Sequence, residues 1–230
     1  MGFKEYERNM SFLDLELSKT LGSSRTQKFL KEIHDYVRWE PIDRILMDVY
    51  PVGKAAVGNS AYPPVMLLKA LLLQKWFGIR SDPELENQIN DRISFKVFIG
   101  LPFGDPSPDH SVISRFRDRV GAKAMERIHT ELLSQLRAKG FSIDAGLAVD
   151  ARLVRSASSP LSKDKIKEKR QERQRKEQGG KKGPVKFSRD LESDWTVKND
   201  VPVYGMKEHA SIDVGSGLVL STVLSRASEH

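Results

Sequence analysis

The stretch GFSIDAGLAVDARLVRSASSP, residues 140–160, decides the fold class, because the apolar spacing changes there from that of helices to that of a strand. Its central part, AGLAVDARLV, is almost continuously apolar, which is typical of a strand covered on both faces. Asp150 interrupts this run, and alternation puts it on the same face as Ala148 and Val154. The sequence therefore predicts a carboxylate within a buried strand.

The residues before Gly140 show apolar side chains at helical spacing, which predicts an all-helical domain over residues 1–140. An apolar central helix is expected at 64–77, opened by Pro63-Pro64 and closed at Gly78. Ser23 or Ser24 is the expected N-cap of an earlier helix, and Ser81 with Glu84 forms a capping box for a later one.

Two helices at about 82–99 and 108–120, joined by a turn that contains prolines, resemble a helix-turn-helix. Gly121 is placed to end or bend the second helix. Amphipathic helix pairs also serve as plain scaffold, so both interpretations stay open. The side chains expected to face outward and meet DNA are His110, Ser111, Ser114, Arg115, Arg117 and Arg119.

After residue 140 we expect the strand around Asp150 and a hairpin of two strands, roughly 203–212 and 218–225, around the turn DVGSG. Three strands are fewer than a covered sheet of ordinary size contains, so residues 141–230 look like a domain cut short. The predicted class is α+β.

The net charge of +7 belongs to one segment. Residues 163–189 contain twelve Lys or Arg and four Asp or Glu, whereas the rest of the chain carries 26 basic and 27 acidic residues. A disordered insertion at about 160–190 and a polyanion-binding tract are both consistent with this composition. Its candidate DNA-contacting residues are Lys169, Arg170, Arg173, Arg175, Lys181 and Lys182.

Several classes of site are excluded by composition. The chain has no cysteine, which rules out disulfides, thiolate metal sites and a thiol nucleophile. It contains no HExxH motif, Walker A loop or nucleophile elbow. No secretory signal or membrane helix is evident, so a cytoplasmic protein is expected.

Asp150 has two interpretations. It is either a structural carboxylate near a strand end, paired with Arg152 or a loop, or a metal ligand of the kind that two-metal phosphoryl chemistry uses. The second role requires at least two more carboxylates. None of the other carboxylates in this part of the chain is marked as a ligand. Asp213 belongs to the hairpin turn, and Glu208 lies at a strand position. The remaining ones lie in a loop-like stretch and are Asp190, Glu192, Asp194 and Asp200.

Three segments together resemble the InsH-type transposases of the insertion sequence five group. They are YPPVMLLKALLLQKWFGIRSDPELENQINDRISFKVFIGLPFGDPSPDHSVISRFRDRV, LAVDARLV, and SDWTVKNDVPVYGMKEHASIDVGSGLVLSTVLSRASEH with its Tyr-Gly-x-Lys. The likeness spans residues 25–230.

This resemblance implies an RNase H-like catalytic domain that uses Mg²⁺ or Mn²⁺ to cleave and join DNA at the terminal inverted repeats of a transposon. Asp150 would be the first carboxylate of the DDE triad and a metal ligand, and the basic tract would meet the DNA backbone. The second Asp and the Glu would lie beyond His230, so stable metal binding by these residues alone is not expected.

Three hypotheses follow from this arrangement. The chain is the N-terminal portion of a transposase, made active by a continuation or a frameshifted reading frame; or a non-catalytic DNA-binding fragment that acts as a repressor; or a remnant that folds only in its helical half. Transposases of this type commonly work as multimers, but no residue pattern here marks a homo-oligomer interface.

Overall fold

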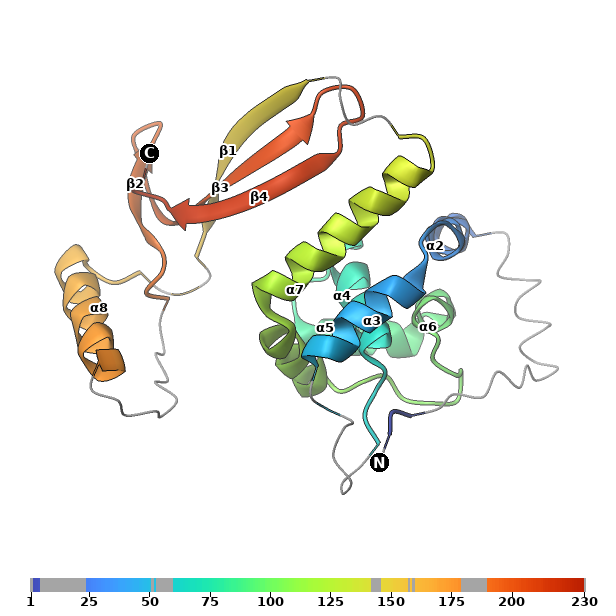
Figure 1. The fold of residues 1–230 in the computed structure, drawn as a ribbon. Helices are drawn as coiled ribbons and strands as arrows, with labels where there is room; N and C mark the ends of the chain where they lie inside the picture. Colours follow the sequence, from blue (N-terminus) through green and yellow to red (C-terminus); the bar gives the residue numbers. More distant parts are fainter. Residues whose placement is uncertain are drawn as a thin grey trace. The chain divides into compact units, whose positions relative to one another are not determined.

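The computed structural model describes residues 2–4, 24–50, 52, 60–141, 146–156, 158, 160–178 and 190–229. The chain divides into two compact units, residues 1–139 and 140–230, of which the first is helical and the second contains a sheet (Figure 1). The predicted mixture of helix and sheet is therefore confirmed. Among the described residues, no helix is both long and apolar enough to cross a membrane.

The helical unit is organised around one apolar helix, which contacts four others. Its helices are α2 (Arg25–Tyr36), α3 (Trp39–Val49), α4 (Pro64–Trp76), α5 (Asp82–Asp91), α6 (Ile93–Ile99) and α7 (His110–Ala138). The central helix is α4, which buries most of its length. Two hydrophobic clusters form around it, and Trp39, Tyr62 and Leu71 pack against both.

The expected helix starts at Ser24 and Ser81 are confirmed. The hydroxyl of Ser24 accepts a hydrogen bond from the backbone N–H of Gln27 at 3.1 Å. The hydroxyl of Ser81 accepts one from Glu84 at 3.3 Å. Each satisfies an N–H that has no partner within its own helix.

The single helix expected at 82–99 is two helices, because the backbone leaves the helical region at Arg92 (φ −106°, ψ 108°). This break lets α5 bury Leu85 and Ile89 while α6 turns Phe95 and Phe98 into the same cluster. The residues before the break carry a continuous helical pattern, so local spacing gives no sign of it.

The connection from α6 to α7 differs from that of a helix-turn-helix. It comprises residues 100–109, whereas that motif has a turn of about 3–4 residues. The buried Lys96 ammonium donates to the carbonyls of Phe103 and Asp105, both at 2.8 Å, and Asn90 pairs with the backbone N–H of Ser107. The long connection is thus fixed to α5 and α6.

Gly121 bends α7, as the sequence predicts. Its backbone (φ 67°, ψ 175°) lies in a region that is essentially restricted to glycine. The bend divides α7 into a first part, residues 110–120, and a second part, residues 122–138. The first part carries all six residues of α7 that we expected to meet DNA.

The second unit contains a four-stranded antiparallel sheet rather than the three strands predicted. Its elements are β1 (Leu147–Arg155), α8 (Lys163–Gln178), β2 (Asp194–Lys198), β3 (Val201–Asp213) and β4 (Val219–Arg226). Strand β3 is central: β1 pairs along one edge, while β2 and β4 pair with successive parts of the other. The additional strand, β2, joins β3 through Asn199 and Asp200, both with positive φ, as in a type I′ hairpin.

Strand β1 is exposed, so the expected cover on both faces is wrong for the described residues. Every β1 side chain except Leu153 is exposed, and Leu147 and Val149 are 62% and 67% exposed. The only described strand that pairs with β1 is β3. Most apolar side chains of β1 are therefore left uncovered by the described residues.

The basic tract forms a helix over residues 163–178, so the expected disorder is wrong there; residues 179–189 lie outside the described part of the chain. Lys, Arg, Gln and Glu are good helix formers. The helix is held to the rest of its unit by Ile166, which is 1% exposed, and by the Arg170 guanidinium, which donates to the carbonyls of Leu191 and Ser193 at 2.8 Å. One apolar side chain is too few to produce a visible periodicity.

Candidate nucleic-acid interface

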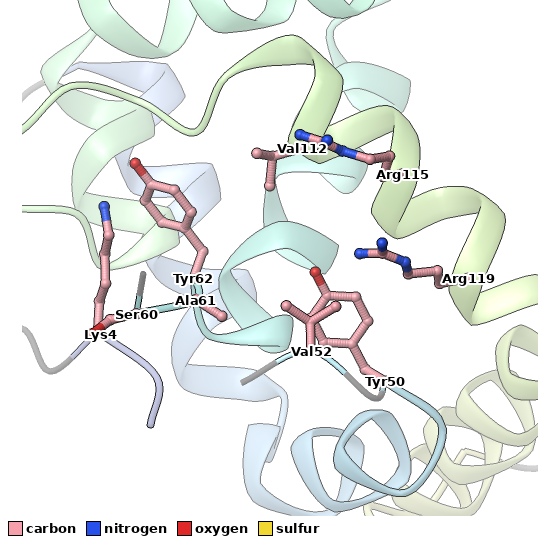
Figure 2. Close-up of a pocket in the computed structure, with 9 residues that line it drawn as sticks. All are labelled: Lys4, Tyr50, Val52, Ser60, Ala61, Tyr62, Val112, Arg115 and Arg119. Atoms are coloured by element: carbon pink, nitrogen blue, oxygen red, sulfur yellow. The ribbon is translucent and has the colours of Figure 1, made fainter. Parts of the chain in front are cut away.

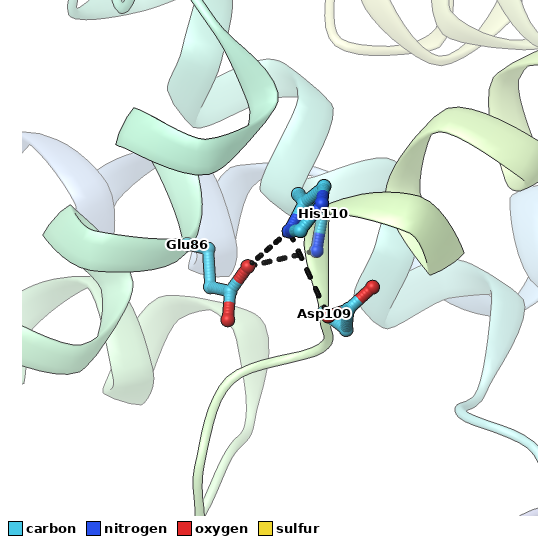
Figure 3. A group of neighbouring side chains, drawn as sticks. All are labelled: Glu86, Asp109 and His110. Carbon is cyan, nitrogen blue, oxygen red and sulfur yellow. Dashed lines mark hydrogen bonds and ion pairs between the residues drawn. The ribbon is translucent and has the colours of Figure 1, made fainter.

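The start of α7 is capped by two carboxylates (Figure 3). Asp109 accepts from the backbone N–H of Ser111 at 2.8 Å. Glu86 accepts from the backbone N–H of His110 at 2.9 Å and lies 2.8 Å from its ring Nδ1. The hydrogen bond with Glu86, followed by the charge of Asp109, raises the pKa of His110.

These three side chains have metal-ligating atoms close together, but the geometry favours a helix cap. Both carboxylates already accept N–H bonds at the positive end of α7, where a cation is disfavoured. His110, expected to face DNA, is therefore engaged with Glu86.

Arg117 is also engaged within the protein. Its guanidinium forms two hydrogen bonds with the Asp82 carboxylate, at 2.7 and 3.1 Å, and a third with Gln74 at 3.1 Å. These contacts join α7 to α5 and α4 beside a hollow of about 350 Å³. The hydrogen bond from Arg117 lowers the pKa of Asp82 despite the opposing effect of burial.

Replacement of Arg117 by glutamine is expected to cost about 1 kcal/mol of stability at neutral pH, the upper end for a partly exposed ion pair. Because the pKa of Asp82 is depressed in the folded state, its contribution is present above the unfolded pKa and is lost as pH falls through the folded pKa. In Arg117→Gln the acid unfolding midpoint should therefore move to higher pH, measured by circular dichroism.

Arg127→Gln is the matched control, since Arg127 lies on the same helix and pairs with the exposed Asp48. We expect a smaller loss of stability there and similar DNA affinity in both variants. An unchanged acid midpoint in Arg117→Gln would contradict the structural role of this pair.

Arg115 and Arg119 line a hollow of about 750 Å³ that we call the α7 pocket (Figure 2). Arg115 is held by Ser111, to whose carbonyl its Nε donates at 3.0 Å and to whose hydroxyl its Nη2 donates at 2.9 Å. Among the described residues, nine line the pocket, and none of them carries a carboxylate. They are Lys4, Tyr50, Val52, Ser60, Ala61, Tyr62, Val112, Arg115 and Arg119.

Sequence reasoning missed the other polar members of the α7 pocket. The backbone N–H of Lys4 donates to the carbonyl of Ala61 at 2.7 Å, and the Lys4 ammonium lies 3.9 Å from the centre of the Tyr62 ring. This contact joins segments almost sixty residues apart, so no local pattern marks it. Of the residues expected to meet DNA, the pocket brings together Arg115 and Arg119; Ser111 holds Arg115, and Ser114 is half-buried on the same helix.

The candidate residues of α8 divide into two groups. Arg170 binds backbone carbonyls and lies 3.4 Å from Asp194, and Arg173 forms an ion pair with Glu192 at 2.6 Å. Lys169 is half-buried and Arg175 is exposed. Lys181 and Lys182 lie outside the described residues.

Asp150 lies exposed on β1, where its carboxylate accepts a hydrogen bond from the backbone N–H of Ala151 at 2.7 Å. Arg152 and Glu208 form an ion pair on the same face of the sheet. Among the described residues, no group of three metal-ligating side chains includes Asp150. These residues therefore do not by themselves fit a magnesium site.

Two other acidic residues of this unit, Asp213 and Asp190, have structural partners. Asp213 is fully buried in the β3–β4 turn, where it accepts from the backbone N–H and hydroxyl of Ser216. Although burial raises the pKa of Asp190, hydrogen bonds from Ser156, Ser193 and Glu192 lower it overall. Asp190, expected in a loop-like stretch, is thus fixed by these hydrogen bonds.

The Tyr-Gly-x-Lys sequence joins distant parts of the second unit. The hydroxyl of Tyr204 donates to the Asp190 carbonyl at 2.6 Å, and the Lys207 ammonium donates to the Glu229 carbonyl at 2.6 Å. A Cβ atom at Gly205 would lie 2.0 Å from the Val154 carbonyl oxygen, so only glycine fits. The Tyr-Gly-x-Lys motif therefore stabilises the sheet that positions Asp150.

Comparison with known proteins adds one finding about the helical unit. No solved structure matches the chain. Residues 19–119 match the family described as Transposase domain (DUF772), a span that includes α2 to α6 and α7 as far as Arg119. The match supports a function in transposition, with DNA as the partner.

Proposed function

We propose that this chain is the N-terminal portion of an InsH-type DDE transposase that binds the ends of its insertion sequence. The observation that carries the proposal is the match of residues 19–119 to a transposase domain. In the complete protein, Asp150 would contribute to Mg²⁺-dependent cleavage and strand transfer from an RNase H-like domain.

The distribution of cations supports the DNA-binding part of this proposal. Arg115 and Arg119 line a pocket to which the described residues contribute no carboxylate, and Arg175 is exposed on α8. Cations in such positions attract the phosphate backbone and release its counterions on binding. Arg117, Arg170 and Arg173 are assigned to internal contacts instead.

The position of Asp150 supports the catalytic part. Its carboxylate is exposed on a strand that is hydrogen-bonded along its length to β3. Leu147 and Val149 are exposed on the opposite face of β1, and that face suits a surface that further protein covers. Mg²⁺ prefers several oxygen ligands, so at least two more carboxylates would have to join Asp150.

A second candidate function is that of a non-catalytic protein that occupies transposon ends and represses transposition. One observation favours it: the described residues place no metal-ligating cluster at Asp150. The two candidates share DNA binding and differ in whether strand cleavage follows.

DNA binding is tested with the purified chain and the terminal inverted repeat of the element that encodes it. We expect the repeat to bind more tightly than a scrambled duplex of equal length at near-physiological salt, in a gel-shift titration. The slope of log K against log salt should be about −0.9 for each phosphate contacted. Equal affinity for both duplexes would count against end recognition.

Cleavage is tested on the same DNA with added Mg²⁺. We expect this chain to leave both strands intact. Nicking that disappears in Asp150→Asn would show that the chain completes a metal site by itself and would exclude the non-catalytic alternative.

A further inference from the structure

We propose that the α7 pocket binds a single unpaired nucleotide, with its phosphate at Arg115 and Arg119 and its sugar and base against Tyr62 and Val112. This inference rests on the proposed DNA binding and names the form of DNA that the pocket takes.

The charge of the pocket selects an anion. Three cationic side chains line it, and the described residues place no acidic side chain in its lining. Two other arginines of the same helix, Arg117 and Arg127, are paired with Asp82 and Asp48. A concave surface lined by cations concentrates anions.

The arginines are placed to hold one phosphate group. Arg115 and Arg119 are four residues apart, so their side chains leave adjacent turns of α7 on the same side. The two hydrogen bonds from Arg115 to Ser111 fix its guanidinium before a ligand arrives. Charge-assisted hydrogen bonds from guanidinium groups to phosphate are among the strongest in proteins.

The shape and the remaining lining favour an unpaired nucleotide over duplex DNA. The hollow of about 750 Å³ has the size of a small-molecule site, whereas a duplex presents its phosphates on a convex surface. Figure 2 shows Tyr62 and Val112, which are half-buried, beside the hollow with the two arginines; Tyr50 is buried against Phe116. An unstacked base needs aromatic and apolar surface of this kind.

The experiment compares two variants that carry the same change on the same helix. Arg119→Gln removes a pocket cation, and Arg127→Gln removes one that is paired with Asp48 outside the pocket. Binding of a fluorescent single-stranded thymidine hexamer to the full-length chain is measured by anisotropy. We expect Arg119→Gln to weaken binding about tenfold or more, the effect of losing a charge-assisted contact, and Arg127→Gln less than about twofold.

Competition experiments identify what the pocket recognises. Thymidine 5′-phosphate should displace the hexamer at lower concentration than inorganic phosphate does, and Tyr62→Leu should reduce this difference. Equal weakening by the two arginine variants would overturn the inference in favour of general charge attraction. Equal competition by the nucleotide and inorganic phosphate would overturn it in favour of a plain anion site.

The measurements distinguish an error in the pocket inference from an error in the proposed end recognition. Specific binding of the terminal repeat, with hexamer affinity unchanged in Arg119→Gln, overturns the pocket inference alone. Hexamer binding that depends on Arg119, without preference for the terminal repeat, overturns end recognition and leaves the pocket in place.

Discussion

In Gly205→Ala, the sheet of the second unit is expected to lose its protection from hydrogen exchange while the helical unit keeps its own. The new Cβ atom would lie 2.0 Å from the Val154 carbonyl oxygen and 2.9 Å from its carbonyl carbon. Both are backbone atoms of a paired strand, so no side-chain rotation relieves the clash. The free energy of unfolding of this unit should fall by about 3 kcal/mol or more, at the upper end of the range for overpacking. Exchange followed by mass spectrometry resolves β1 and β3 from α4.

Gly104→Ala is the matched control, because its added Cβ meets nothing within 4 Å. Exchange in that variant should equal the wild type in both units. Wild-type protection of β1 and β3 in Gly205→Ala would mean that the two strands do not approach as closely as described.

The features that the sequence predicts correctly are those that depend on near neighbours. Ser24 and Ser81 are N-caps because a hydroxyl reaches an N–H three residues on. Gly121 bends α7 because its backbone conformation is open essentially to glycine. The apolar run of α4 is buried because a helix that is apolar on all sides must be enclosed.

The features that the sequence does not predict depend on distant partners. Helix α8 is held by Ile166 and by Arg170 bonds to a segment about twenty residues later. Alternation indicates which side chains of β1 share a face, but it contains no information on what covers them. Exposure of Val149 is therefore visible only in the structure.

The candidate site shows the same division on a single helix. Arg115, Arg117 and Arg119 look alike in the sequence, and helical spacing separates Arg117 from the other two. Asp82 lies thirty-five residues before Arg117, so their pairing is not apparent from local pattern. Lys4 joins the α7 pocket through a contact with Ala61 that is still more distant in the sequence.

In Phe116→Ala, the helical unit is expected to lose about 3–5 kcal/mol of stability, the range for removing a buried phenylalanine. Phe116 is fully buried, and its ring packs edge-on against Tyr50 with centroids 5.3 Å apart. It belongs to the cluster that contains Ile42 and Leu46 of α3, so the cavity would open between α3 and α7. Hydrogen exchange of α3 and α7 measures the loss without contributions from the second unit.

Phe29→Ala is the control for this variant, since Phe29 is 39% exposed and packs at the edge of Trp76 and Phe77. The loss of stability in Phe29→Ala should be clearly smaller.

Phe116 also lies between Arg115 and Arg119 in sequence, on the opposite, buried side of α7. Loosening that side should therefore weaken hexamer binding at the α7 pocket even though both arginines remain. Equal losses of stability in the two variants would mean that the cluster around Phe116 does not hold the first part of α7, and the pocket would then lack a rigid wall.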